Sequence, residues 1–481
     1  MLASILLSTL AIPGQAQTSN PNSDLEQLRE TVLSLEARVA VLEKERSEAP
    51  VSCAVPASDG TKTAAALVSA TMELKPSGGE SSSTEQVAAS SATPEIPAQT
   101  PSPLHPTLPG GATLNYTIDG YYEYNFNDPV GGVNLLRAYD VTSNSFNLNQ
   151  AAVIFDLQPD VSAGRRYGAR LDLQFGQATS TLQGNPANEN RPDVWRNVFQ
   201  AYGTYVVPVG SGLTVEFGKW ASSLGIEGNY TKDQMNYSRS YFFNYLPYYH
   251  MGFNTNYRFN DKIAASYWVV NGTQQTEDEN AFKDQLFSVQ LAPAKTVSWT
   301  VNYYFGQDHP DTTPSTSCTA PMQPGLCATP INPAPNGKLH IFDTYATWQA
   351  MPKLTLAGEG DYVIEREWAN AAPGESSAPS HVDGGVAYAL WQFTPRIAVA
   401  GRSEYLSDRG GLFSNETQAL KEVTGTYQYK FGDGFEAFLE YRRDWSNRPY
   451  FLTNQTSVLS GDQNTTTMGL VWWSGGKQGS W

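Results

Sequence analysis

Sixteen stretches of alternating apolar and polar residues occupy the chain from about residue 113 to its end. In the first of them, Leu114, Tyr116 and Ile118 alternate with Asn115 and Thr117. Successive side chains of a β-strand point to opposite faces, so each stretch predicts a strand with one apolar and one polar face. Most stretches are about 9 to 12 residues long, which is the length that a tilted strand needs to cross a bilayer.

The gaps between these stretches alternate in length, with short connections after the even-numbered strands and long ones after the odd-numbered strands. In outer-membrane barrels one rim carries tight turns and the other carries long loops. The sequence therefore predicts an all-β fold, a closed antiparallel transmembrane β-barrel of about 16 strands over residues 112–481. The second strand alternates poorly. The predicted strands are 113–126, 146–158, 166–176, 196–206, 212–220, 250–259, 262–271, 284–292, 296–306, 338–349, 353–364, 382–393, 396–406, 416–430, 434–445 and 465–474.

Charged residues occur on the polar faces of several predicted strands. A charged strand can span a bilayer only if its charges face a wet lumen. Two interpretations stay open: opposite charges set up a transverse field across the pore, or they pair between neighbouring strands and hold the wall together. Tryptophans near strand ends suit the interfacial girdles, but any one of them could equally serve ordinary strand packing. They are Trp220, Trp268, Trp299, Trp348 and Trp445. The predicted pore-lining residues are Arg166, Arg170, Asp172, Glu359, Asp361, Arg402, Glu404, Glu436, Glu440 and Arg442.

The long connection 221–249 follows the fifth predicted strand and is rich in aromatic residues. So many aromatic side chains are not expected to stay fully exposed to water. We predict that this loop folds into the barrel as a constriction. It could line the lumen and offer its aromatic faces to sugar rings, or it could pack on the inner wall and only narrow the bore. The residues predicted at the constriction are Lys232, Asp233, Tyr237, Arg239, Tyr241 and Tyr245.

Three segments precede the barrel. Residues 1–16 have the apolar core and small residues of a signal peptide cleaved after Ala16, although a positive n-region is missing and the natural start could lie upstream. Residues 24–46 carry apolar residues at heptad spacing, which predicts a coiled-coil stalk or, alternatively, an amphipathic helix packed on the barrel. Residues 47–111, rich in Pro, Ser and Ala, predict a disordered linker in the periplasm.

Composition narrows the chemistry. The net charge of −16 argues against a nucleic-acid partner, which requires a basic footprint. The five histidines accompany no G-x-S-x-G or H-E-x-x-H motif, so we expect no enzyme and no cofactor. No His or further Cys lies within ligand spacing of Cys318 and Cys327, so we expect no metal site. Cys318 and Cys327 share one loop-like stretch and could form a disulfide in an oxidising compartment; their spacing leaves that open.

Several segments resemble β-barrel porins of the OmpL-like type, mostly in the N-terminal half of the barrel; the C-terminal half resembles them only in its alternation. These segments are FNLNQAAVIF (146–155), YGARLDLQFG (167–176), FQAYGTYVVPVGSGLTVEFGKWASSLGIEG (199–228) and NYSRSYFFNYLPYYHMGFNTNYRF (236–259).

The resemblance implies an outer-membrane channel for the passive diffusion of small hydrophilic solutes, surrounded by outer-membrane lipids. By analogy the chain would form a homo-oligomer, a trimer, with its N-terminal region in the periplasm. The stalk and linker resemble devices by which some porins reach peptidoglycan. Two alternatives stay open: a solute-selective, sugar-like channel, and a structural or adhesive barrel with a plugged pore.

Overall fold

The computed structural model places the barrel region of the chain. The signal peptide, the coiled coil, most of the linker and both Cys318 and Cys327 lie outside the described residues, so those predictions stay predictions. The residues that the structure describes are 108, 110–183, 189, 191–308, 313–314, 328–329, 338–366, 378–432 and 434–474.

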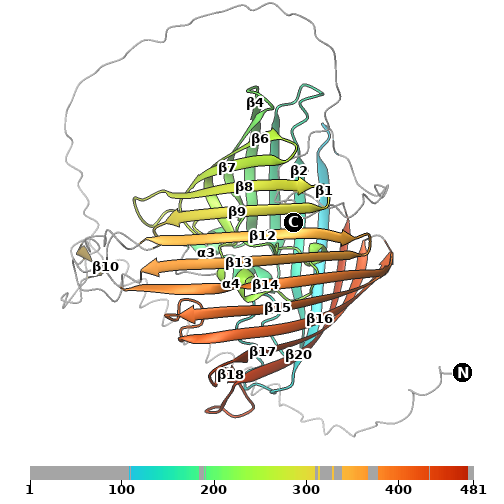
Figure 1. The fold of residues 1–481 in the computed structure, drawn as a ribbon, viewed down its shortest axis with the longest axis vertical. Coiled ribbons are helices and arrows are strands. Elements are labelled where there is room, and N and C mark those ends of the chain that lie inside the picture. The colour runs from blue at the N-terminus through green and yellow to red at the C-terminus, as the bar shows by residue number, and fades with distance from the viewer. Residues whose placement is uncertain are drawn as a thin grey trace, which may run out of the picture. The chain divides into compact units, whose positions relative to one another are not determined.

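Sixteen antiparallel strands form a closed barrel in which each strand pairs with the barrel strands before and after it in the chain, and β1 pairs with β20 (Figure 1). Two short ladders, β10–β11 (Thr313–Pro314, Ala328–Thr329) and β18–β19 (Phe451–Leu452, Leu459–Ser460), lie outside it. The barrel strands are β1 (Thr113–Asn125), β2 (Ser145–Leu157), β3 (Tyr167–Phe175), β4 (Val198–Val207), β5 (Leu213–Ala221), β6 (Tyr249–Asn260), β7 (Ile263–Val270), β8 (Asp284–Ala294), β9 (Val297–Gly306), β12 (Leu339–Met351), β13 (Leu354–Arg366), β14 (Pro379–Thr394), β15 (Ile397–Arg409), β16 (Gln418–Gly432), β17 (Phe435–Ser446) and β20 (Asp462–Ser474).

The prediction of a 16-stranded barrel is confirmed, and the observed strand ends lie within three residues of the predicted ones. The two faces of the wall differ as the alternation requires. Along β3, Arg170 and Asp172 are buried on the inner face, whereas Tyr167, Leu171 and Phe175 are exposed on the outer face. Closure leaves no unpaired strand edge, which is the condition for a sheet to stand in hydrocarbon.

A β-bulge explains why the second strand alternates poorly in the sequence. Asp119 of β1 pairs with Gln150, but the next residue, Gly120, pairs with Leu148. Asn149 is therefore an extra residue in β2, and both Asn149 and Gln150 are buried. An inserted residue shifts the inside–outside phase of the residues on either side of it.

Two of the five tryptophans predicted in the interfacial girdles are inside the barrel instead. Trp299 and Trp348 are exposed on the outer surface, as expected. Trp220 and Trp268 are buried and meet edge to face, with ring centroids 5.5 Å apart, in an apolar cluster within the wall. Their indoles pack against interior side chains, so for these two the alternative of ordinary packing holds.

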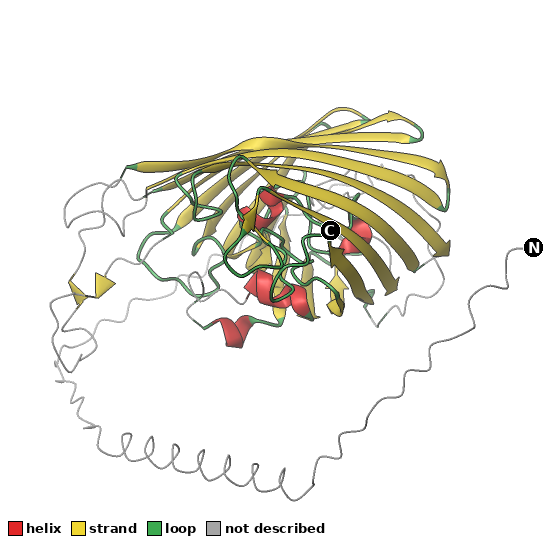
Figure 2. Cartoon of the chain, turned by 90° about the horizontal axis from the view of Figure 1, so that it is seen from below, coloured by secondary structure: helices red, strands yellow, loops and turns green. Residues whose placement is uncertain are grey.

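Long connections fold back on the concave side of the curved sheet, together with the short helices (Figure 2). They carry α2 (Gln177–Gln183), α3 (Pro192–Trp195), the 3-10 helix η1 (Thr231–Asp233) and α4 (Tyr241–Tyr245). No helix of the described residues is both long and apolar enough to cross a membrane.

The orientation of the wall predicts the effect of charges on its outer face. Leu439 points outward near the middle of β17 and is 55% exposed. Leu439→Arg should destabilise the barrel in lipid vesicles by about 2–4 kcal/mol, the usual cost of Arg at the bilayer midplane. Urea unfolding followed by tryptophan fluorescence measures this.

The control is Ser407→Arg on the outer face of β15, beside Asp383 and close to the long-loop rim. Near the interface the same charge costs only about 0–1 kcal/mol. Equal losses for the two variants would contradict the assigned membrane position.

Candidate functional site

Residues 222–248, which we call the inward loop, connect β5 to β6. The two ends of the loop meet at the wall, where Ala221 pairs with Tyr249 and the Ser222 amide donates to the Tyr248 carbonyl at 3.0 Å. The middle of the loop is buried: Tyr230 and Tyr241 have no exposed surface, and Arg239 is 1% exposed. Its contacts run to the inner faces of strands on several sides of the barrel.

Two glutamates of the wall hold the backbone of the inward loop. Glu404 of β15 accepts the amides of Tyr241 and Phe242 at 2.7 and 2.9 Å, one on each carboxylate oxygen. Glu440 of β17 accepts the amides of Tyr237 and Ser238 in the same way, at 2.7 and 3.0 Å. Hydrogen bonds to an ionised carboxylate are stronger than neutral ones, so these two side chains fix the loop's position.

Two arginines of the same strands hold the carbonyl groups between those amides. Arg402 donates to the Ser238 carbonyl at 2.7 Å, and its guanidinium also pairs with Glu422 at 2.8 Å and Glu227 at 3.0 Å. Arg442 donates to the Arg239 carbonyl at 2.5 Å and pairs with a neighbouring wall carboxylate at 2.8 Å. Acidic and basic wall residues thus bind alternate polar groups of one loop.

Strands on the other side of the β1–β20 seam hold the loop through its side chains. Asp119 of β1 accepts the hydroxyl groups of Thr231 and Tyr237 at 2.6 and 2.7 Å, and Asp172 of β3 accepts the Tyr230 hydroxyl at 3.0 Å. Burial raises the pKa of both loop phenols well above its usual value, so they remain protonated and donate. The loop is therefore fastened on two sides.

Arg239 does not face free space. Its guanidinium donates to the carbonyls of Gly228, Tyr237 and Asn229 at 3.1, 2.8 and 2.9 Å, and it lies 5.1 Å from the ring centroid of Tyr139. Arg239 therefore stabilises the loop by binding the loop's own backbone. A charge reversal at Arg239 would disrupt the fold of the loop, so a change in ion selectivity could not be assigned to the charge itself.

The other predicted constriction residues also have partners. Lys232 and Asp233 pair with each other at 2.9 Å. The Tyr241 hydroxyl donates to Asp444 at 2.7 Å. Tyr245 is half-buried, and its ring centroid lies 5.6 Å from that of Phe413.

The predicted wall residues separate into two groups. Glu359, Arg402, Glu404, Glu440 and Arg442 meet the inward loop or its anchors, and the Glu359 carboxylate accepts the Ile226 amide at 2.9 Å. Asp172 contacts the loop and pairs with Arg170 at 2.9 Å.

The remaining three take no part in the anchoring hydrogen bonds described above. Arg166 precedes β3 and donates to the Val206 carbonyl at 3.3 Å. Glu436 is buried near the short-turn end of β17. Asp361 is buried on β13, on the same face as Glu359. Whether any of these side chains lines an open pore stays a prediction.

Sequence reasoning missed several members of the network. Asp119, Glu422 and Asp444 lie on polar faces of predicted strands, so alternation alone could have added them. Glu227 and Arg137 lie in loops, where no periodicity marks them. Arg137 belongs to the connection 126–144 and donates to Asp444 at 2.8 Å, so a second loop also enters the barrel.

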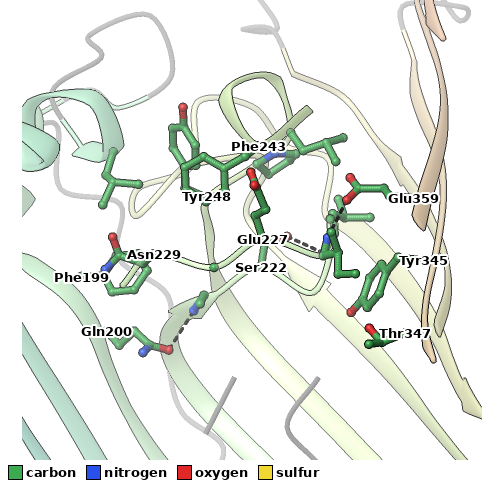
Figure 3. A pocket seen from close by; sticks show the side chains of 18 residues that line it. Phe199, Gln200, Ser222, Glu227, Asn229, Phe243, Tyr248, Tyr345, Thr347 and Glu359 are labelled. Atoms are coloured by element: carbon green, nitrogen blue, oxygen red, sulfur yellow. Dashed lines mark hydrogen bonds between the residues drawn. The ribbon is translucent and has the colours of Figure 1, made fainter. Parts of the chain in front are cut away.

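A cavity lies between the root of the inward loop and the wall (Figure 3). Phe199, Phe243, Tyr248 and Tyr345 give it aromatic walls, with polar groups from residues such as Gln200 and Asn229. Its free volume of about 50 Å³ compares with roughly 10–15 Å³ for one water and about 300–1,000 Å³ for a typical ligand site. It has room for a few waters.

The closed wall, its apolar outer face and its polar interior define an outer-membrane β-barrel. The chain belongs to the family described as "Putative beta-barrel porin-2, OmpL-like", whose model matches residues 111–472. No curated protein sequence matches it significantly.

Among solved structures, the outer membrane channel DcaP of Acinetobacter baumannii is similar with a TM-score of 0.48 and 8% identity, over 76% of this chain and 97% of that one. OmpF of Salmonella typhi in complex with daunomycin gives 0.45 and 11%, over 76% and 97%. An anion-selective porin from Comamonas acidovorans gives 0.44 and 8%, over 76% and 99%.

The anchoring network predicts that Arg402→Ala releases the inward loop. Removing the guanidinium leaves Glu227 without its cation and the Ser238 carbonyl without its donor, and breaking a buried ion pair costs about 3–5 kcal/mol. The urea midpoint should fall, and trypsin should cut after Lys232 or Arg239.

The matched control is Arg443→Ala on the outer face of β17, two strands away from Arg402. Its pair with Asp462 is largely exposed, so its loss should change the midpoint little. If both variants resist trypsin equally, the wall charges do not hold the loop.

Proposed function

We propose that this protein forms a water-filled channel through the bacterial outer membrane for the passive diffusion of small hydrophilic solutes. One observation carries the proposal: a long loop is fastened by charged wall residues inside a closed barrel of sixteen strands. Barrels of about 16 to 18 strands are wide enough to leave an aqueous channel. The loop narrows that channel without serving as part of its wall.

Polar residues on the inner face support a water path beside the loop. These side chains face inward on five strands in the half of the barrel near the short turns, and each is only partly buried. Charges of both signs are among them. They are Thr204, Glu216, Asn256, Arg258, Gln290 and Thr355.

The aromatic residues of the loop do not favour a sugar-selective site. Tyr230, Tyr237 and Tyr241 are buried against the wall, and the small cavity at the loop root has no room for a sugar ring. The proposal therefore gives these rings a packing role. It also assigns no catalytic step to the chain.

A plugged structural barrel is the second candidate function, and the extent of burial favours it. Two connections, 126–144 and 222–248, place fully buried side chains such as Tyr139 and Tyr230 inside the wall. A plug of this kind would block passage while leaving the outer surface and rim loops available.

The N-terminal region is proposed to lie in the periplasm. The guanidinium of Arg165, in the short turn between β2 and β3, donates to the Gln158 carbonyl at 2.8 Å and to the Gly110 carbonyl. The chain before β1 therefore reaches the barrel at the short-turn rim, which faces the periplasm in outer-membrane barrels.

A homo-oligomer is proposed from the outer surface of β12–β15. A row of small residues runs directly across these strands on the outer face, each opposite the next: Ala346, Gly358, Ala387 and Ser403. Small side chains let two walls approach closely in a membrane.

Single-channel recording in planar bilayers separates the two candidate functions. The wild-type protein should give discrete conductance steps, and replacing residues 229–238 by a short Gly-Ser linker should enlarge them because the constriction is removed. Steps from the linker variant alone would favour the plugged barrel. Silence from both, with folding verified, would contradict the channel.

Truncation tests the assignment of the N-terminal region. Deleting residues 17–107 removes the predicted stalk and linker but keeps Gly110 and its contact to Arg165. The shortened barrel should insert and conduct with unchanged step size. Loss of insertion would mean that the removed region takes part in building the barrel.

A further inference from the structure

Three carboxylates lie together on the inner face of β12 and β13. Asp343 is directly opposite Asp361 in the strand pairing, and Glu359 lies two residues before Asp361 on the same face. Their exposed fractions are only 2%, 5% and 7% for Asp343, Asp361 and Glu359. One oxygen from each lies within 4.8 Å of the other two.

These carboxylates lack the partners that other buried acids of this barrel have. Asp343 accepts the Asn302 amide group at 2.6 Å, and Glu359 accepts the Ile226 backbone amide at 2.9 Å. Their other oxygens have no hydrogen-bond partner among the described residues, and neither does either oxygen of Asp361. Within the same part of the chain, no Arg, Lys or His forms an ion pair with any of the three.

Three unbalanced negative charges in a buried site are unfavourable. Removing even one ionised carboxylate from water costs several kcal/mol unless a counter-charge or hydrogen bonds replace the solvent. Glu404 and Glu440 meet that need with pairs of loop amides. The site formed by Asp343, Glu359 and Asp361 has too few donors, so it needs positive charge from outside the chain.

We propose that Asp343, Glu359 and Asp361 bind a divalent cation of the Ca²⁺ type. Ca²⁺ takes oxygen ligands at about 2.3–2.6 Å, so ligands on opposite sides of the ion lie roughly 4.6–5.2 Å apart. The 4.8 Å limit on the three oxygens fits one such coordination sphere. Carboxylates without nitrogen or sulfur ligands favour a hard cation, and Mg²⁺ would require stricter octahedral geometry.

The bound ion would lie where the inward loop crosses to the wall. Glu359 contributes its second oxygen to the Ile226 amide, and a side chain at Gly225 would stand only 3.4 Å from the first one. Gly225 has a positive φ of 81°, a backbone conformation that favours glycine. The cation therefore fixes the first arm of the loop to β13, whether or not the barrel conducts.

The sequence predicted no metal site, because neither His nor Cys occurs at ligand spacing. The present site comes from carboxylates on two strands whose pairing brings Asp343 and Asp361 together. Alternation assigns them to the inner face but does not reveal that they are neighbours.

Binding is tested on the full-length protein in detergent after removal of metal with EDTA. Calorimetric titration with Ca²⁺ should show one saturable site, and Tb³⁺ should give luminescence sensitised by Tyr345, which lies two residues from Asp343 on the same face of β12. Asp361→Asn should weaken Ca²⁺ affinity at least tenfold, and Glu359→Gln provides a second variant if Asp361→Asn does not refold.

Urea unfolding of wild type and Asp361→Asn gives an independent test, because Ca²⁺ should reverse which of the two proteins is more stable. In EDTA, Asp361→Asn should unfold at higher urea concentration than wild type, because it removes an uncompensated charge. In Ca²⁺ the order should reverse.

The control is Asp408→Asn, since that carboxylate already accepts the amides of Gly411, Phe413 and Ser414 at 2.8 to 3.1 Å. Its Ca²⁺ affinity should equal that of wild type. Absence of saturable binding by wild type, or equal affinity of wild type and Asp361→Asn, would overturn the proposal and leave protons shared among the three carboxylates.

Discussion

The hydrogen bonds between β1 and β20 are the constraint on which the rest of this structure depends. They run from the pair Tyr116–Ser474 to the pair Asn125–Thr465 and join the first and last strands of the sheet. Hydrocarbon offers no water to an unpaired backbone group, so a sheet in a bilayer must close on itself. Closure then separates an interior from the lipid, and only that interior can hold buried charges such as Arg402 and Glu422.

The inner wall supplies hydrogen-bond partners for the backbone of the inward loop. Buried backbone amides and carbonyls need partners, and residues 236–240 have neither a helix nor a ladder to supply them. Glu404 and Glu440 accept the amides, while Arg402 and Arg442 donate to the carbonyls between them. These four charged residues were expected to face the permeating solute. Instead they hold in place the inward loop, which narrows the pore.

Local periodicity explains both what the sequence could predict and what it could not. Alternation repeats every two residues, so it located all sixteen strands, although extra residues such as Asn149 in β2 and Phe199 in β4 disturb it. It assigned a face to Arg402 and Glu440 but could not name their partners, because Tyr237 and Glu440 are 203 residues apart. The surroundings of Trp220 and Arg239 stayed open for the same reason, because burial at a strand end or in a loop depends on which distant segment packs there.

The two-sided attachment of the loop has a consequence for how the barrel assembles. Tyr237 binds Asp119 of β1 and Glu440 of β17, and these strands come together around β20 only after the last hairpin has joined the first strand. In a sheet that has not yet closed, the inward loop lacks part of its hydrogen-bond partners on the wall. The acidic wall residues likewise lack the loop groups that they bind in the closed barrel. Contacts between such distant parts of a chain form late and slowly. Complete docking of the loop therefore requires that the circle of strands is closed.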